Sequence, residues 1–231
     1  MEYERTGILR EQHFDKYLVL HITLLFAFWI MYEIFIAPFI KEYNLVYFNI
    51  LNPSIKVLGW TVPVFVILHA AGIDKLKYLK LNNNVKKGFM WGIFISIVTV
   101  LYNITGAVVM YNNIGFNPLF DINKWIGGVI LIGFTEEVLF RGYFLQRAAT
   151  NMKFWIANIV VSLLFLAIHF PIWYAKGSEV ASGGMEWLCL ILFVFLFSIV
   201  QGYVLKKSQS LWPCIMMHSV NNFMANALIL S

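Results

Sequence analysis

Three ionisable side chains stand close together inside an apolar stretch of the sequence. Residues 133–146 read GFTEEVLFRGYFLQ and contain Glu136, Glu137 and Arg141. Charged side chains at the depth of a membrane are costly unless they are paired or line a wet cavity, so they mark a functional site by default. On a helix, Glu137 and Arg141 are four residues apart and share a face, whereas Glu136 is rotated by about 100° from Glu137. We therefore expect Glu137 to neutralise Arg141 and Glu136 to point elsewhere.

This arrangement leaves Glu136 without a local partner. A buried carboxylate that has no partner holds its proton more tightly than an exposed one and is a candidate general base. The alternative interpretation is that Glu136, Glu137 and Arg141 together form a buried ionic cluster that only joins helices. The catalytic interpretation is favoured because a structural ion pair needs only one carboxylate per arginine, and this stretch has two carboxylates for one arginine.

Two further apolar runs contain a histidine and a second notable side chain on the same helical face. FLAIH places Phe165 and His169 four residues apart, just before Pro171, and HSVNN places His218 and Asn222 at the same spacing. A lone histidine in a membrane helix is usually an interhelical hydrogen-bonding group. Two such histidines, in a chain that also has an unpaired glutamate, indicate a catalytic site instead.

The combination of glutamate, histidine and asparagine fits the addition of water to an amide carbonyl. Glu136 can take the proton from water, a histidine can orient that water or move the proton, and neutral donors can hold the developing oxyanion. No serine lies in a GxSxG turn, and neither Cys189 nor Cys214 is next to a histidine in the sequence. An acyl-enzyme mechanism is therefore disfavoured.

Zinc is the alternative to a mechanism without a metal. Glu136, His169 and His218 could supply three zinc ligands and leave a fourth position open. The sequence has no HExxH, however, and a role as ligand would remove Glu136 as the base unless Glu137 replaced it. We therefore expect no cofactor, with zinc held by Glu136, His169 and His218 as the alternative.

The elements that must position these residues are membrane helices. The chain has 231 residues, of which 60% are hydrophobic and only 13% are charged, far outside the range of soluble proteins. The net charge of +5 comes from lysines and arginines in short loops, which membrane orientation explains, so we expect no nucleic-acid partner. We expect an all-α, polytopic transmembrane bundle that forms a single domain over 1–231, with the catalytic core at about 124–231.

Seven apolar runs are long enough to cross the lipid bilayer as helices. They cover residues 17–40, 54–73, 88–111, 124–146, 154–171, 184–205 and 210–230, with long outer connections at 112–123 and 176–184. If each run crosses the membrane, twelve lysines and arginines, including Arg5, Arg10 and Lys16, fall on the same side of the membrane as the N-terminus. Four fall on the other side, namely Lys41, Lys56, Lys124 and Lys176. This bias predicts that the N-terminus is cytoplasmic and the C-terminus lies outside.

The candidate residues do not lie at one depth if every run is a straight helix. With a rise of about 1.5 Å per residue, Glu136 is near the middle of its run, whereas His169 is nearer the outer end of its own. The side chains can meet only if the runs are tilted, re-entrant or broken, as Pro171 and Pro213 permit.

Taken together, EEVLFR at 136–141, FLAIH at 165–169 and HSVNN at 218–222 resemble the three motifs of the CPBP family. That family comprises the type II CAAX prenyl endopeptidases and the bacterial proteins grouped with bacteriocin processing and immunity. The resemblance covers about 125–231. It implies an intramembrane endopeptidase with a helical core and an active site sunk below the cytoplasmic face.

The family's functional residues carry over by motif position. The resemblance implies that Glu136 is the water-activating base, that His169 is its partner, and that His218 and Asn222 stabilise the oxyanion. It further implies that Glu137 and Arg141 form a supporting ion pair and that Phe165 packs at the cavity.

The substrate stays open between several kinds of peptide. A CAAX protease acts near a prenylated cysteine at a protein's end, whereas the small size of this chain is typical of a prokaryotic plasma-membrane protein acting on a peptide or a membrane protein tail. The alternative from another class is a non-catalytic membrane scaffold or immunity protein in which the same motifs only join helices. Ion or solute transport is disfavoured because the sequence shows no inverted repeat.

Overall fold

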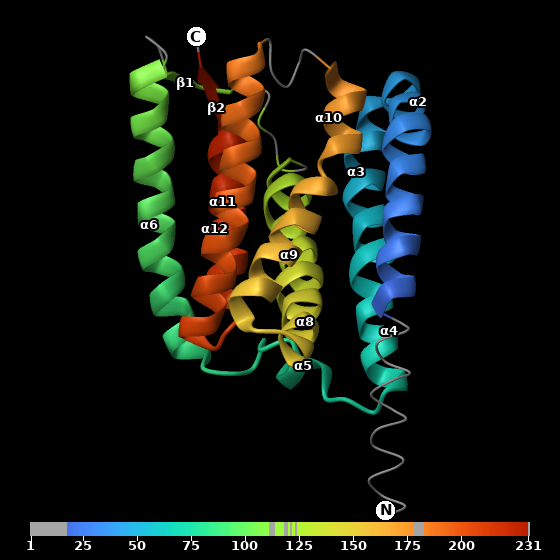
Figure 1. Ribbon diagram of the computed structural model, residues 1–231. Coiled ribbons are helices and arrows are strands. Elements are labelled where there is room, and N and C mark those ends of the chain that lie inside the picture. Colours follow the sequence, from blue (N-terminus) through green and yellow to red (C-terminus); the bar gives the residue numbers. More distant parts are fainter. Residues whose placement is uncertain are drawn as a thin grey trace, which may run out of the picture.

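The computed structural model describes residues 18–110, 114–117, 120, 122, 124–177 and 183–230. Arg5, Arg10 and Lys16, and parts of the two expected outer connections, lie outside the described residues. Within them, the predicted class is confirmed, because the chain forms a polytopic bundle of helices (Figure 1).

Each predicted apolar run overlaps a helical segment of the structure. In chain order the segments are Leu18–Tyr43, with η1 (Tyr32–Ile36) and α2 (Ala37–Tyr43); α3 (Leu45–Lys56), η2 (Val57–Thr61) and α4 (Val62–Ala70); α5 (Lys75–Tyr78); α6 (Val85–Met110); η3 (Lys124–Leu131), α7 (Ile132–Glu137), η4 (Val138–Leu145) and α8 (Gln146–Asn151); α9 (Phe154–Ala167) and α10 (Phe170–Lys176); α11 (Gly184–Ser208); and α12 (Trp212–Ala227). The η segments are π-helical, a form that is frequently found at functional sites.

Five of the helical segments are long and apolar enough to cross a membrane, judged by length and composition. They are Leu18–Tyr43, Ile50–Ala70, Val85–Val109, Phe154–Lys176 and Gly184–Ser208. The chain is therefore a multi-pass membrane protein. The predicted total of seven spans stays a prediction, since the segment 124–151 carries the charged cluster and α12 is only 16 residues long.

The C-terminal residues do not continue the last helix as expected. The predicted run 210–230 ends as a helix at Ala227, and β2 (Leu228–Leu230) pairs antiparallel with β1 (Ile114–Phe116). The prediction of helix over 228–230 is therefore wrong. Apolar residues at the end of a helical run carry no sign of a partner strand more than a hundred residues away.

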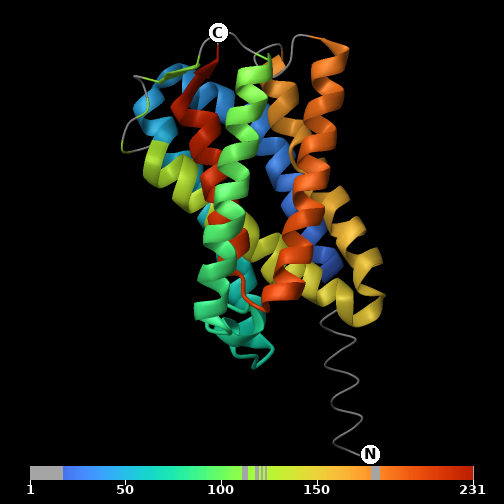
Figure 2. The same ribbon diagram turned by 90° about the vertical axis from the view of Figure 1, so that its left-hand side faces the viewer.

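Helix α12, which carries HSVNN, packs against α7, which carries the two glutamates of EEVLFR. It packs against α6, α11, α7 and η3, and α6 runs alongside it in both views (Figures 1 and 2). Gly133 of α7 lets the two helices approach closely, because an added Cβ would lie 3.1 Å from the backbone nitrogen of Ser219. This contact brings the two glutamates of α7 beside His218 of α12.

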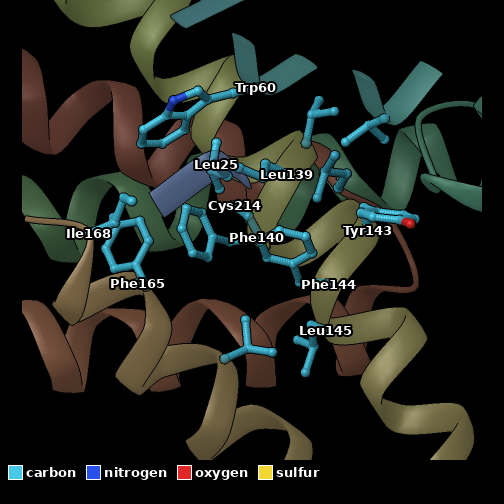
Figure 3. Close-up of a cluster of buried hydrophobic side chains, with 14 of the residues drawn as sticks. Leu25, Trp60, Leu139, Phe140, Tyr143, Phe144, Leu145, Phe165, Ile168 and Cys214 are labelled. Carbon is cyan, nitrogen blue, oxygen red and sulfur yellow. The ribbon is translucent and has the colours of Figure 1, made fainter. Parts of the chain in front are cut away.

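The apolar core surrounds η4, the π-helical segment that follows the two glutamates. All eight residues of η4 are buried. Figure 3 shows the aromatic side chains of this segment among side chains of other helices, with labelled examples Phe140, Tyr143, Phe144, Phe165, Leu25 and Trp60. The packing fixes the part of the chain that carries Arg141 and its neighbours.

The fifth predicted run is broken where its histidine lies. Helix α9 ends at Ala167, His169 lies in the turn, and Pro171 stands in the first turn of α10. The break expected from Pro171 is therefore present, and it redirects the chain at the depth of His169. Pro213 instead stands at the beginning of α12 and breaks no helix.

Candidate active site

A cavity of about 580 Å³ lies between the helical segments. Its lining residues come from five segments: Trp29; Phe48, Asn52, Pro53, Lys56 and Trp60; Lys124, Gly127, Gly128, Ile132 and Glu136; Ile168, His169, Ile172, Trp173 and Lys176; and His218, Asn222, Ala225 and Asn226. Four of the residues predicted for the site, Glu136, His169, His218 and Asn222, therefore face one volume.

The two adjacent glutamates have different surroundings. Both are buried at the end of α7, but Glu136 lines the cavity whereas Glu137 does not. The Oε1 atom of Glu137 accepts a hydrogen bond from Nη1 of Arg141 at 3.0 Å. The guanidinium also lies over the ring of Phe165, with 4.2 Å between Cζ and the ring centroid. The cluster is therefore arranged in two layers, one facing the cavity and one behind it.

The expectation that Glu136 is unpaired is wrong. Lys56, the last residue of α3, donates from Nζ to Oε1 of Glu136 at 2.6 Å, and both side chains are buried. The other carboxylate oxygen, Oε2, has no hydrogen-bond partner among the described residues and lies 3.7 Å from Nε2 of His218. One oxygen of Glu136 is thus held by a cation, while the other has no hydrogen-bond partner among the described residues.

Sequence reasoning missed Lys56 as a site residue and counted it among the outer lysines. The ion pair joins residues 80 positions apart, so no local spacing indicates it. One signal was present in the sequence, because Lys56 interrupts an apolar run, and an isolated lysine at membrane depth needs a partner.

His218 is oriented by Glu137. Its Nδ1 lies 2.6 Å from the same Oε1 atom of Glu137 that Arg141 contacts. A carboxylate accepts hydrogen bonds, so Nδ1 carries the proton in this contact. Nε2 is then the ring atom nearer Glu136 and the cavity. Glu137 therefore serves both Arg141 and His218, a second function that the i, i+4 spacing alone did not predict.

His169 is held by the turn in which it lies. Its Nδ1 is 2.7 Å from the carbonyl oxygen of Phe165, and because a carbonyl only accepts, Nδ1 is the donor. In the neutral ring Nε2 is consequently free to accept a proton. The two rings, His169 and Phe165, pack edge to face with 4.8 Å between centroids. Phe165 does not line the cavity but packs behind it.

Asn222 lies one helical turn after His218 and faces the cavity. Its Nδ2 donates to the carbonyl oxygen of Gly128 at 3.2 Å, which fixes the amide plane. An asparagine amide has two N–H donors, so one of them is left for a group in the cavity. His218 and Asn222 can therefore offer donors from the same face of α12.

The donor set does not fit a zinc ion. Among the described residues, no three His, Cys, Asp or Glu side chains are grouped so that they could hold a metal ion. The ammonium of Lys56 also stands 2.6 Å from the carboxylate that would be the first ligand, and two cations compete for that position. We derive no step through a metal, and the expectation of a mechanism without one stays a prediction.

The cavity lies at one end of the bundle. Most of its lining residues come from α3, η3, α10 and the second half of α12, toward the end of the bundle where β1 and β2 lie (Figure 1). We call this the strand end. The opposite, lysine-rich end has eight lysines in its loops and in the helices beside them, namely Lys75, Lys77, Lys80, Lys86, Lys87, Lys153, Lys206 and Lys207. The cavity and the lysine-rich end therefore lie at opposite ends of the bundle. The expectation that the lysine-rich end is cytoplasmic is incompatible with the expectation that the site opens to the cytoplasm.

The comparison with protein families agrees with the three motifs. Residues 118–224 match the family model described as type II CAAX prenyl endopeptidase Rce1-like. The match confirms the resemblance stated from EEVLFR, FLAIH and HSVNN, all of which lie inside it. No curated protein and no solved structure matches the chain.

Proposed function

We propose that this chain is an intramembrane endopeptidase that hydrolyses a peptide bond with a water activated by Glu136. The observation that carries the proposal is the unpartnered Oε2 of Glu136, in a residue that lines one cavity together with two histidines and an asparagine. A carboxylate fixed at one oxygen and free at the other can bind and deprotonate a water molecule.

The first step is the attack of water on the scissile carbonyl carbon. Oε2 of Glu136 takes one proton while the water oxygen forms a bond to the carbon, and the carbonyl oxygen becomes an oxyanion. His218 and Asn222 donate to that oxyanion from one face of α12. In this role His218 carries protons on both nitrogens, and Glu137 supports that form because it accepts the proton on Nδ1.

The second step is the collapse of the tetrahedral intermediate. The carbon–nitrogen bond breaks, and the leaving amine takes the proton from Glu136, which regenerates the carboxylate. His169 assists as a relay, since its Nε2 can accept and return a proton while Nδ1 stays bonded to Phe165. No covalent intermediate with the protein is needed.

The substrate we propose is a peptide segment, either a prenylated CAAX-type tail, a short peptide or a membrane protein tail. The cavity volume of about 580 Å³ is within the usual range of small-molecule sites, so it holds a few residues around the scissile bond and not a folded domain. The lipid bilayer supplies the apolar surroundings for a lipid group or a helical tail.

A non-catalytic scaffold is the second candidate. It is favoured by the extent of pairing within the cluster, since Lys56, Glu136, Glu137, Arg141 and His218 contact one another. Such a network can join three helical segments without doing chemistry. The two functions differ in whether a peptide bond is broken.

Cleavage of defined peptides tests the proposal. Purified protein in phospholipid vesicles is incubated with a farnesylated CAAX-type peptide, its unprenylated counterpart and a membrane protein tail, and products are identified by mass spectrometry. The wild type is expected to cleave at least one of them, and Glu136→Ala none, while the variant remains monodisperse. Cleavage of none by the wild type, or full cleavage by Glu136→Ala, overturns the proposal.

A further inference from the structure

Lys56 is the one lysine or arginine that forms an ion pair with Glu136 among the described residues, and it belongs to no motif of the matched family region. It ends α3, lies outside the matched residues 118–224, and is 7% exposed. Its ammonium lies over two tryptophan rings, 4.9 Å from the centroid of Trp29 and 4.8 Å from that of Trp60. Aromatic faces stabilise a desolvated cation, so this position is built for a charged lysine.

Lys56 also affects the orientation of the Glu136 carboxylate. Its bond to Oε1 fixes the rotation of the Glu136 carboxyl group, and Oε2 is then the oxygen without a partner, 3.7 Å from Nε2 of His218. Without the ammonium, either oxygen of Glu136 could turn toward His218. The pair thus determines which oxygen atom of Glu136 is left without a partner.

We propose that Lys56 is a positioning residue for Glu136, holding Oε1 so that Oε2 is presented to the attacking water. The inference rests on the function proposed above. It adds a fourth element, the junction of α3 and η2, to the three motif-bearing helices that form the site. The two tryptophans fix the ammonium, and the ammonium fixes the carboxylate.

The cavity makes this role testable by chemical rescue. Lys56 lines the cavity, so Lys56→Ala opens a space beside Glu136 that connects with the same volume. Ethylammonium can enter that space and replace the missing ammonium between the two tryptophans. A role confined to joining helices would not be restored by a free cation during turnover.

The experiment uses full-length protein in vesicles and the peptide of the panel that the wild type cleaves. Lys56→Ala is expected to lower kcat on the order of 100-fold, as misplacement of a reacting group by about 1 Å does, with a much smaller change in KM. Added ethylammonium should raise kcat of Lys56→Ala along a saturable curve. Glu136→Gln should not respond to the amine.

The matched control is Lys77→Ala, which removes an exposed lysine at the lysine-rich end of the bundle. Its turnover is expected to equal that of the wild type with and without ethylammonium. If Lys56→Ala is recovered in too low a yield, Lys56→Arg and Lys56→Met replace it. Arginine keeps a cation beside Glu136 and should retain part of kcat, whereas methionine, of similar length and without charge, should lose it.

The outcomes separate this inference from the function on which it rests. Loss of kcat in Lys56→Ala with amine rescue supports the positioning role. Turnover by Lys56→Ala or Lys56→Met equal to that of the wild type overturns the positioning role and leaves the proposed function standing. The same conclusion follows if no amine restores kcat of Lys56→Ala and Lys56→Arg is also inactive. Cleavage of no peptide by the wild type overturns both.

Discussion

Glu136 and Glu137 are neighbours in the chain, but each meets a different set of partners. Glu136 contacts Lys56 and faces the cavity, whereas Glu137 accepts from Arg141 and lies beside Nδ1 of His218. A helix turns by about 100° per residue, so adjacent side chains necessarily point in different directions. The family's doubled glutamate is explained by this division between a cavity layer and a supporting layer.

Arg141 belongs to the supporting layer, so its loss should affect folding first. Arg141 and Glu137 are 1% and 0% exposed, and Arg141→Ala leaves a buried carboxylate with one cationic partner fewer. Such losses typically cost about 3–5 kcal/mol. Thermal unfolding of the purified variant should show the loss. Arg141→Lys should recover only part of it, because an ammonium lacks the planar fork. An Arg141→Ala protein as stable as the wild type would show that Arg141 is not a structural partner.

Dependence on a metal is also decided at the residue scale. Because Lys56 occupies the position beside Oε1 of Glu136, turnover is expected to survive exhaustive chelation, and elemental analysis should find no stoichiometric zinc. About one zinc per chain, with activity lost on chelation and restored by zinc, would make Glu136, His169 and His218 the ligands. A chelated sample refilled with magnesium is the control for non-specific effects.

Local spacing predicted the pairs within one helix and missed the pairs between helices. The contact between Glu137 and Arg141 follows from i, i+4 spacing, whereas Lys56 reaches Glu136 and His218 reaches Glu137 across about eighty residues. A single sequence gives the type of residue at each position but not the distance between two helices. The sequence therefore predicts that an isolated charge has a partner, but it does not identify that partner.

At the scale of elements, the site is assembled where regular helices are interrupted. The π-helical segments η3 and η4 flank α7 and its glutamates, η2 begins directly after Lys56, and His169 lies in the turn between α9 and α10. The apolar runs predicted the helices, and Pro171 predicted one interruption. The π-helical turns and the β1–β2 pair were not predictable, since both depend on contacts between distant segments.

Close approach of α7 and α12 is the element-scale feature that most directly brings the two glutamates beside His218. Gly133→Ala would place a methyl group 3.1 Å from the backbone nitrogen of Ser219 and push the helices apart. Overpacking of this kind costs about 1–3 kcal/mol, and turnover should fall with the loss of the Glu137–His218 contact. Gly106→Ala in α6, where nothing lies within 4 Å, is the matched control and should change neither property. Equal stability and turnover in both variants would refute the argument from close approach.

At the scale of the whole molecule, the charges and the cavity lie at opposite ends. Among the described residues, the lysine-rich end has eight lysines, whereas the strand end has Lys41 and the three cavity lysines Lys56, Lys124 and Lys176. The bias of positive loops predicts that the lysine-rich end is cytoplasmic. On this prediction the cavity lies nearer the other side of the membrane, contrary to what the family resemblance implies.

Cysteine labelling in intact cells tests this orientation. In a background without Cys189 and Cys214, a membrane-impermeant maleimide should label Gly115→Cys at the strand end without lysis. It should label Lys77→Cys at the lysine-rich end only after lysis. Labelling of Lys77→Cys alone in intact cells would place the cavity on the cytoplasmic side and show that the lysine bias misleads in this chain.

The central claim is that Glu136 accepts a proton from water, and replacing its carboxylate by an amide tests this most directly. Glu136→Gln keeps the shape and can still hydrogen-bond between helices, but an amide cannot accept the proton. The control is Glu33→Gln, which changes another buried glutamate that does not line the cavity. On the peptide cleaved by the wild type, kcat of Glu136→Gln should fall by on the order of 100-fold or more while Glu33→Gln keeps its turnover. Turnover by Glu136→Gln equal to that of the wild type would contradict the account.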